Sequence, residues 1–107
     1  MNVQFKKGVL ELCVLACLHG KDRYGYELVQ TISKQIEISE GSVYPLLRKL
    51  AKEEYFITYL QESTEGPPRK YYQLTAKGRQ YLHELVAEWQ QFSTGVNHII
   101  QEGLSHD

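Results

Sequence analysis

Residues 39–54 read S-E-G-S-V-Y-P-L-L-R-K-L-A-K-E-E, and this stretch decides the fold. Its apolar residues recur at i, i+3, i+4 and i+7, the spacing of one face of an α-helix; they are Val43, Leu46, Leu47 and Leu50. The opposite face has small residues near its start and cations further along, and with its flanks it comprises Gly41, Ser42, Tyr44, Pro45, Arg48, Lys49 and Lys52. The stretch therefore predicts a helix with one buried face and one exposed basic face.

The first residue of this helix stays open at the level of sequence. Ser39 is a suitable N-cap, but Pro45 then lies beyond the first turn and removes a backbone hydrogen bond to Gly41, which costs up to ~3 kcal/mol. If Ser42 is the N-cap instead, Pro45 falls in the first turn, where proline is tolerated.

The segment at residues 6–19 predicts another helix. Residues 9–18 hold a single polar side chain, Glu11, and their length and their content of Ala, Leu and Glu favour a helix over a buried strand. A helix that is apolar on all sides, in a protein this small, indicates that another subunit covers part of it.

The chain between these two helices predicts a turn, a helix and a short link. Residues 20–23 have the composition of a turn. Apolar side chains at four-residue spacing over residues 24–35 predict a second amphipathic helix. Residues 36–38 are long enough only for a linking strand.

Two runs after the basic helix predict a β-hairpin. Residues 55–63 and 69–74 are rich in aromatic and β-branched residues, and T-E-G-P-P at residues 64–68 separates them. A Gly/Pro segment of this kind is excluded from a helix or a central strand, so we expect it to form a projecting tip. The stretch from Gly66 to Arg79 contains four cations and no acid, which are Arg69, Lys70, Lys77 and Arg79.

The last segment predicts one long helix, with Thr75 as its N-cap and its end near Gly103. Within it, apolar residues repeat in a 4-3-4-3 pattern that is typical of coiled-coil faces; they are Leu85, Trp89, Phe92, Val96 and Ile99. One small domain offers no partner for so long an apolar stripe, so we expect a dimerisation seam.

These elements together predict a mainly α fold with a small β-hairpin. Their order is that of a winged helix-turn-helix domain followed by a long C-terminal dimerisation helix. We expect the DNA-binding domain to cover residues 1–75 and the dimerisation helix residues 76–107, the two forming one compact unit.

The charges are divided unevenly along the 107 residues, although the formal net charge is only −1. Residues 1–79 carry all 12 Lys and Arg against 9 Asp and Glu, a balance of +3, whereas residues 80–107 carry 4 acids and no Lys or Arg. This asymmetry predicts that residues 1–79 bind nucleic acid and that the last helix does not contact it.

Several other classes of protein are not expected. Cys13 and Cys17 have no second cysteine pair, and His19 does not complete a tetrahedral set with them, so we expect no metal and no cofactor. The four histidines are scattered and no catalytic motif appears, so we expect no enzyme. The longest apolar run is too short to span a bilayer and no signal peptide is apparent, so we expect a cytoplasmic protein without a membrane segment.

Four stretches of the sequence resemble the PadR family of transcriptional regulators, in particular its short form. They occur in the order and spacing typical of that family: Y-G-Y-E-L at residues 24–28, S-E-G-S-V-Y-P-L-L at 39–47, G-P-P-R-K-Y-Y at 66–72 and L-T-A-K-G at 74–78. One departure is Glu54, where the family usually ends its recognition helix with a glycine in the left-handed conformation. We expect Glu54 in that conformation to cost roughly 1 kcal/mol.

The resemblance implies a helix that begins before Ser42, a homodimer built through the first and last helices, and repression of transcription at a palindromic site. It also implies that Tyr44 contacts DNA and that Trp89 lines a pocket between subunits for a small planar aromatic effector. From the residues and the resemblance together we expect these side chains to contact DNA: Ser42, Tyr44, Arg48, Lys49, Lys52, Arg69 and Lys70. The alternative is a winged-helix module for protein–protein contact that binds no specific DNA.

Overall fold

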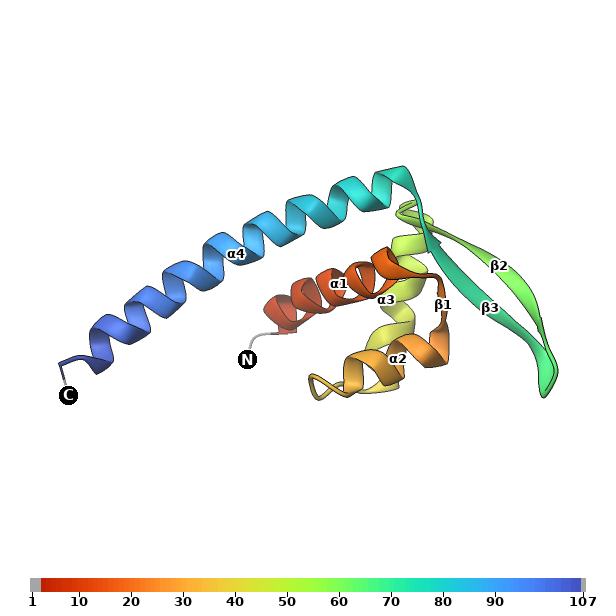
Figure 1. Cartoon of the computed structure of the whole chain (residues 1–107), viewed down its shortest axis with the longest axis horizontal. Coiled ribbons are helices and arrows are strands. Elements are labelled where there is room, and N and C mark those ends of the chain that lie inside the picture. Colours follow the sequence, from red (N-terminus) through yellow and green to blue (C-terminus); the bar gives the residue numbers. More distant parts are fainter. Residues whose placement is uncertain (1–2, 107) are drawn as a thin grey trace.

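The computed structural model describes the backbone of residues 3–106 and the side chains of residues 8–106 (Figure 1). It confirms a mainly helical fold with a small antiparallel sheet and a long C-terminal helix. The elements follow in the order α1 (Val3–Gly20), β1 (Arg23–Tyr24), α2 (Gly25–Ser33), α3 (Glu40–Lys52), β2 (Phe56–Ser63), β3 (Gly66–Leu74) and α4 (Ala76–Leu104).

The core lies where α1, α2 and α3 meet the sheet and the first turns of α4. All four apolar residues that the sequence places on the inner face of α3 are buried, as are Val14 and Leu15 of α1 and Phe56 at the start of β2. Burying a leucine or phenylalanine side chain contributes ~1.5–3 kcal/mol, so this small set accounts for much of the driving force for folding.

The start of α3, left open by the sequence, is at Ser39. This residue is the N-cap with extended backbone (φ −105°, ψ 151°), and Pro45 therefore lies inside the helix. The Ser39 side chain makes no capping hydrogen bond; its Oγ lies 3.0 Å from the Oγ of Ser42 instead. Burial of the apolar face of α3 thus stabilises a helix that Pro45 and the missing capping hydrogen bond both weaken.

The end of α3 is a left-handed turn at Glu54, so the chain keeps this conformation although glycine is absent. Glu54 has φ 64°, and the backbone N–H groups of Glu54 and Tyr55 donate to the carbonyl oxygens of Ala51 and Leu50 at 3.0 and 3.1 Å. This pair of bonds is the Schellman arrangement, in which glycine usually occupies the left-handed position.

The sheet contains a strand that the sequence analysis missed. Its strand order is β1-β3-β2, and β1 pairs with β3 through Arg23↔Tyr72 and Tyr24↔Tyr71. A two-residue strand has no periodicity of its own, so it is recognisable only from its partner. The linking strand predicted at residues 36–38 is wrong: this segment is irregular, and the Ile36 N–H donates to the carbonyl of Ile32 at 3.0 Å.

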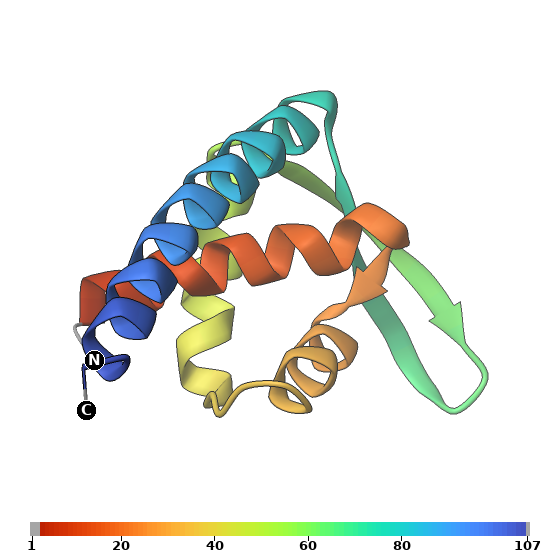
Figure 2. The same ribbon diagram turned by 60° about the vertical axis from the view of Figure 1, so that its left-hand side comes forward.

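The hairpin, or wing, is longer than predicted because β3 begins at Gly66 and includes Pro67 and Pro68. Prolines are tolerated there because β1 reaches only residues 71 and 72, which leaves the other edge of β3 open at the tip. The pairing with β2 is also irregular between Gln61 and Ser63, opposite the prolines. The wing projects from the body of the molecule in both views (Figures 1 and 2).

Helix α4 begins as predicted, with the Thr75 side chain accepting a hydrogen bond from the Gly78 N–H at 3.0 Å. Its first half packs beside α1, and its second half projects beyond the rest of the chain (Figure 1). Phe92 and Ile99 are 53% and 73% exposed in the single chain. The apolar stripe of α4 is thus largely exposed in the single chain.

Candidate nucleic-acid interface

The start of α3 and the tip of the wing lie at the same end of the molecule. In Figures 1 and 2 the first turn of α4 is at the opposite end, and β3 runs from one end to the other. A duplex placed across α3 and the wing would therefore be remote from the start of α4.

The exposed side of α3 presents small and basic side chains, as the sequence predicts. Ser42, Arg48 and Lys52 are exposed, whereas Tyr44 is half-buried. The ring of Tyr44 lies against Gly25 at the start of α2, so closely that a Cβ on Gly25 would be 3.0 Å from Tyr44 Cε1. Because Gly25 has no side chain, the Tyr44 ring can pack between α2 and α3.

Arg48 of α3 lies near β3, because its charge acts on Tyr72. Burial raises the pKa of Tyr72 in β3, the nearby Tyr44 hydroxyl raises it further, and the positive charge of Arg48 opposes this shift. Both α3 side chains thus lie near Tyr72. Lys70 is two residues before Tyr72 and so lies on the same face of β3. Arg48 of α3 is therefore near the strand that carries Lys70 two residues closer to the wing tip, and both side chains are exposed.

Arg69 lies on the other face of the wing, because neighbouring residues of a strand point to opposite sides. Its guanidinium carbon is 4.6 Å from the centre of the Tyr24 ring. Arg69 and Lys70 therefore lie on opposite faces of the wing and do not form one patch. Tyr24 is not among the side chains that the sequence predicts to contact DNA, although it lies in the Y-G-Y-E-L stretch.

Lys49 is not brought together with the other cations of α3. Its Nζ is 3.8 Å from the Glu11 Oε1, and Glu11 is a buried residue of α1. The Tyr81 hydroxyl donates to the same oxygen at 3.2 Å, and burial together with the Glu11 charge raises the pKa of Tyr81 to about 12. Lys49 thus serves as the counter-ion of a buried carboxylate.

The basic run from Gly66 to Arg79 does not form a single patch in space. Lys77 and Arg79 belong to the first turn of α4, at the far end of β3 from the wing tip. The Lys77 ammonium donates to the Glu53 carbonyl at 2.9 Å and lies 5.0 Å from the centre of the Tyr55 ring. Lys77 therefore stabilises the carboxyl end of α3, where a cation is favoured by the helix dipole.

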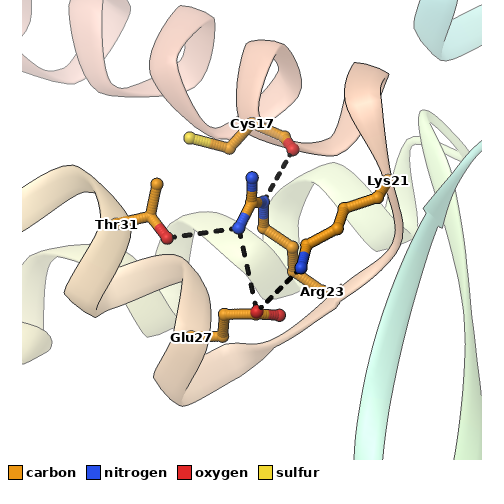
Figure 3. Close-up of polar contacts among 5 residues, drawn as sticks. All are labelled: Cys17, Lys21, Arg23, Glu27 and Thr31. Carbon is orange, nitrogen blue, oxygen red and sulfur yellow. Dashed lines mark hydrogen bonds and ion pairs between the residues drawn. The ribbon is translucent and has the colours of Figure 1, made fainter.

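Arg23 is a structural cation that the charge count did not distinguish (Figure 3). Its guanidinium donates to the Cys17 carbonyl at 2.9 Å and to the Thr31 hydroxyl at 3.3 Å, and it pairs with Glu27 at 3.8 Å. Lys21 contacts the same carboxylate at 3.4 Å. These bonds join the end of α1 to α2. The guanidinium of Arg23 therefore has a structural role.

The predicted seam of α4 runs from the domain core into solvent. Leu85 is half-buried against the core, while Trp89, Phe92, Val96 and Ile99 are exposed in the single chain. A groove of about 360 Å³ opens between α1 and α4, lined by Gly8, Val9, Leu12, Leu85, Glu88, Trp89 and Phe92. The Trp89 and Phe92 rings both line this groove, with centroids 6.4 Å apart.

The family model of the PadR-like transcriptional regulators matches residues 14–84, which is more than half of the chain. The chain belongs to the PadR-like family of transcriptional regulators. The match covers α2, α3 and the wing, the elements that carry the exposed cations described above.

Individual PadR-family relatives agree with this assignment. The crystal structure of a PadR-like transcriptional regulator from Bacillus cereus is 43% identical and superposes with a TM-score of 0.83, covering 92% of this chain and 97% of that one. A Lysinibacillus sphaericus protein described as uncharacterized protein X is 36% identical over 92% of this chain and 93% of its own length. Bacillus subtilis PadR, solved in complex with operator DNA, shares the fold at 24% identity and a TM-score of 0.66, over 73% of this chain and 46% of that chain.

The part of this PadR-family chain that the structure describes shows neither a membrane span nor a metal cluster. No helix among residues 3–106 is long and apolar enough to cross a bilayer. No three His, Cys, Asp or Glu side chains of the described residues come together as metal ligands. Burial raises the pKa of both Cys13 and Cys17, so these thiols stay protonated at neutral pH.

Proposed function

We propose that this PadR-family regulator represses transcription by binding a palindromic promoter site as a homodimer. The observation that supports this best is that two neighbouring elements each present an exposed cation, Arg48 on α3 and Lys70 on the wing. Neither cation has an ion pair within the described residues, so both charges are available to phosphates.

The proposed contacts with DNA come from two elements. On α3 they are made by Ser42, Tyr44, Arg48 and Lys52, and on the wing by Arg69 and Lys70. Lys49 contributes less, because its ammonium is paired with Glu11. The small residues at the start of α3 allow close approach to base edges, and the cations then bind phosphates or guanine acceptors.

The homodimer forms through α1 and α4. Its seam consists of Leu85, Trp89, Phe92, Val96 and Ile99, most of which are exposed in the single chain. The two functions belong to different segments of the chain: residues 1–75 bind DNA, and residues 76–107 form the dimer. A regulator that acts on promoter DNA in this way works in the cytoplasm.

The function is tested by titrating duplexes that carry the chain's own promoter, and random duplexes, at ~0.1 M salt. We expect the promoter to be bound 10³-fold or more tightly than random DNA, with two chains per site and a steep loss of affinity as salt increases. Fluorescence anisotropy gives the affinity and sedimentation gives the stoichiometry. Equal affinity for both duplexes would contradict the proposal and favour the protein–protein module instead.

We also propose that a small planar aromatic effector binds in a pocket between the subunits, lined by Trp89, to which each chain contributes its groove between α1 and α4. Among the described residues that line the groove, Glu88 is the one charged side chain, and the size of the groove suits a ligand of that class. We expect a panel of flat aromatic compounds to include one that quenches the fluorescence of Trp89 saturably and weakens promoter binding. Trp89 is the only tryptophan of the chain, so the signal is unambiguous. Linear quenching by every compound would contradict an effector site.

A further inference from the structure

The contact between Arg69 and Tyr24 joins the wing to the residue that precedes α2. The guanidinium carbon lies 4.6 Å from the ring centre, within the range of a cation–π interaction. Arg69 is exposed and has no hydrogen bond or ion pair within the described residues. The ring of Tyr24 is therefore what determines where this cation lies.

Tyr24 is itself held by an array of side chains on the same face of the sheet. Its ring packs against Tyr71 at 5.5 Å, and Tyr71 stacks on Tyr59 of β2 at 5.6 Å with an interplanar angle of 14°. The Tyr59 hydroxyl donates to the Asp22 carboxylate at 2.6 Å, and this bond raises the pKa of Tyr59 to about 12. The Gln73 amide donates to the same carboxylate oxygen at 3.1 Å.

This array spans all three strands and so fixes the wing and the Tyr24 ring relative to each other. A free arginine side chain loses rotamer entropy when it is fixed on a ligand. A ring contact made before binding removes part of that cost. It also leaves the positive charge in place, whereas the carboxylates paired with Lys49 and Arg23 neutralise theirs.

We propose that Tyr24 is a positioning residue of the DNA interface: its ring holds the Arg69 guanidinium where it binds a backbone phosphate. This inference rests on the proposed function, because it assigns Tyr24 a role only in DNA binding. It extends the interface to a residue of β1 that lies outside both α3 and the wing.

The contact is tested first without DNA, by NMR of the Arg69 side chain in wild type, Tyr24→Phe and Tyr24→Leu. The aromatic ring should shift the Arg69 proton signals upfield in wild type and in Tyr24→Phe, and the shift should vanish in Tyr24→Leu. Tyr26→Leu is the matched control, because Tyr26 is exposed and has no ring contact with Arg69. Unshifted Arg69 signals in the wild type would overturn the inference, whatever the protein binds.

The role is tested next by promoter affinity at ~0.1 M salt. We expect Tyr24→Leu to bind about two- to fivefold more weakly and Tyr24→Phe to bind like wild type, which is the range of an exposed cation–π contact. In an Arg69→Ala background, Tyr24→Leu should have no further effect, whereas any effect of Tyr26→Leu should persist there. Unfolding curves of each variant verify that the fold is retained.

The outcomes separate the two proposals. If the wild type binds its promoter and the effects of Tyr24→Leu and Arg69→Ala simply add, the positioning role is overturned and the proposed function stands. If the upfield shift is present but the protein does not distinguish its promoter from random DNA, the proposed function fails and the role of Tyr24 in binding fails with it.

Discussion

Replacing Gly78 by alanine is expected to destabilise the folded chain by about 3 kcal/mol. A Cβ at this position would overlap the backbone carbonyl oxygen of Tyr55 and would lie 3.1 Å from Leu74 Cδ2. The obstacle is mostly backbone, so no side-chain rotation relieves it. The same oxygen accepts the Thr75 N–H at 3.1 Å, and the clash would therefore also disturb the junction of β3 and α4.

The measurement is thermal or urea unfolding followed by circular dichroism at one fixed protein concentration, since a dimer's stability depends on concentration. A loss of 3 kcal/mol corresponds to a melting temperature lower by roughly 10–20 °C for a domain of this size. Gly95→Ala in the same helix is the control, because a Cβ there meets nothing within 4 Å. That substitution should be neutral or stabilising by up to ~1 kcal/mol. Equal stability of the two variants would contradict the close approach of α4 to Tyr55.

The second large effect is expected from removing Arg48 and Lys70 together. The double variant Arg48→Ala/Lys70→Ala should bind the promoter roughly 10–100-fold more weakly at ~0.1 M salt, because each chain loses two phosphate or base contacts. The slope of log affinity against log salt should decrease by about 2 per chain. Anisotropy titrations at four or more salt concentrations give both quantities.

Lys77→Ala/Arg79→Ala is the matched control, since it removes the same charge from each chain. Both residues belong to the first turn of α4, at the far end of β3 from the wing tip. We expect this control to change the affinity less than threefold. If both double variants weaken binding equally, the effect comes from net charge alone, and Arg48 and Lys70 do not mark the binding site.

The elements with strong periodicity were predictable from the sequence because their signals are local. The i, i+3, i+4, i+7 spacing of Val43 to Leu50 fixes both the helix and its buried face, and every one of those four residues is buried. Thr75 was recognisable as an N-cap for the same reason, since a cap bonds to an N–H three residues away.

The position of the α3 N-cap depended on tertiary packing. Local rules left Ser39 and Ser42 as alternatives, and a proline within a helix disfavours Ser39. The buried side chains of the whole face offset that cost, so the helix begins after Ser39 all the same. Strand β1 was missed for a related reason, because its two residues form a strand only through Tyr71 and Tyr72, almost 50 residues further along the chain.

The sequence by itself determined the winged-helix order, the basic character of α3 and the wing, and the exposed apolar stripe of α4. It did not determine which cations are available to a ligand, because the sequence does not show which lysines and arginines are paired with a carboxylate. Glu11 engages Lys49, Glu27 engages Arg23, and the ring of Tyr24 receives Arg69 without neutralising it. Only the tertiary structure brings such partners together, because the strength of a charge interaction depends on distance and burial in space and not on spacing along the chain.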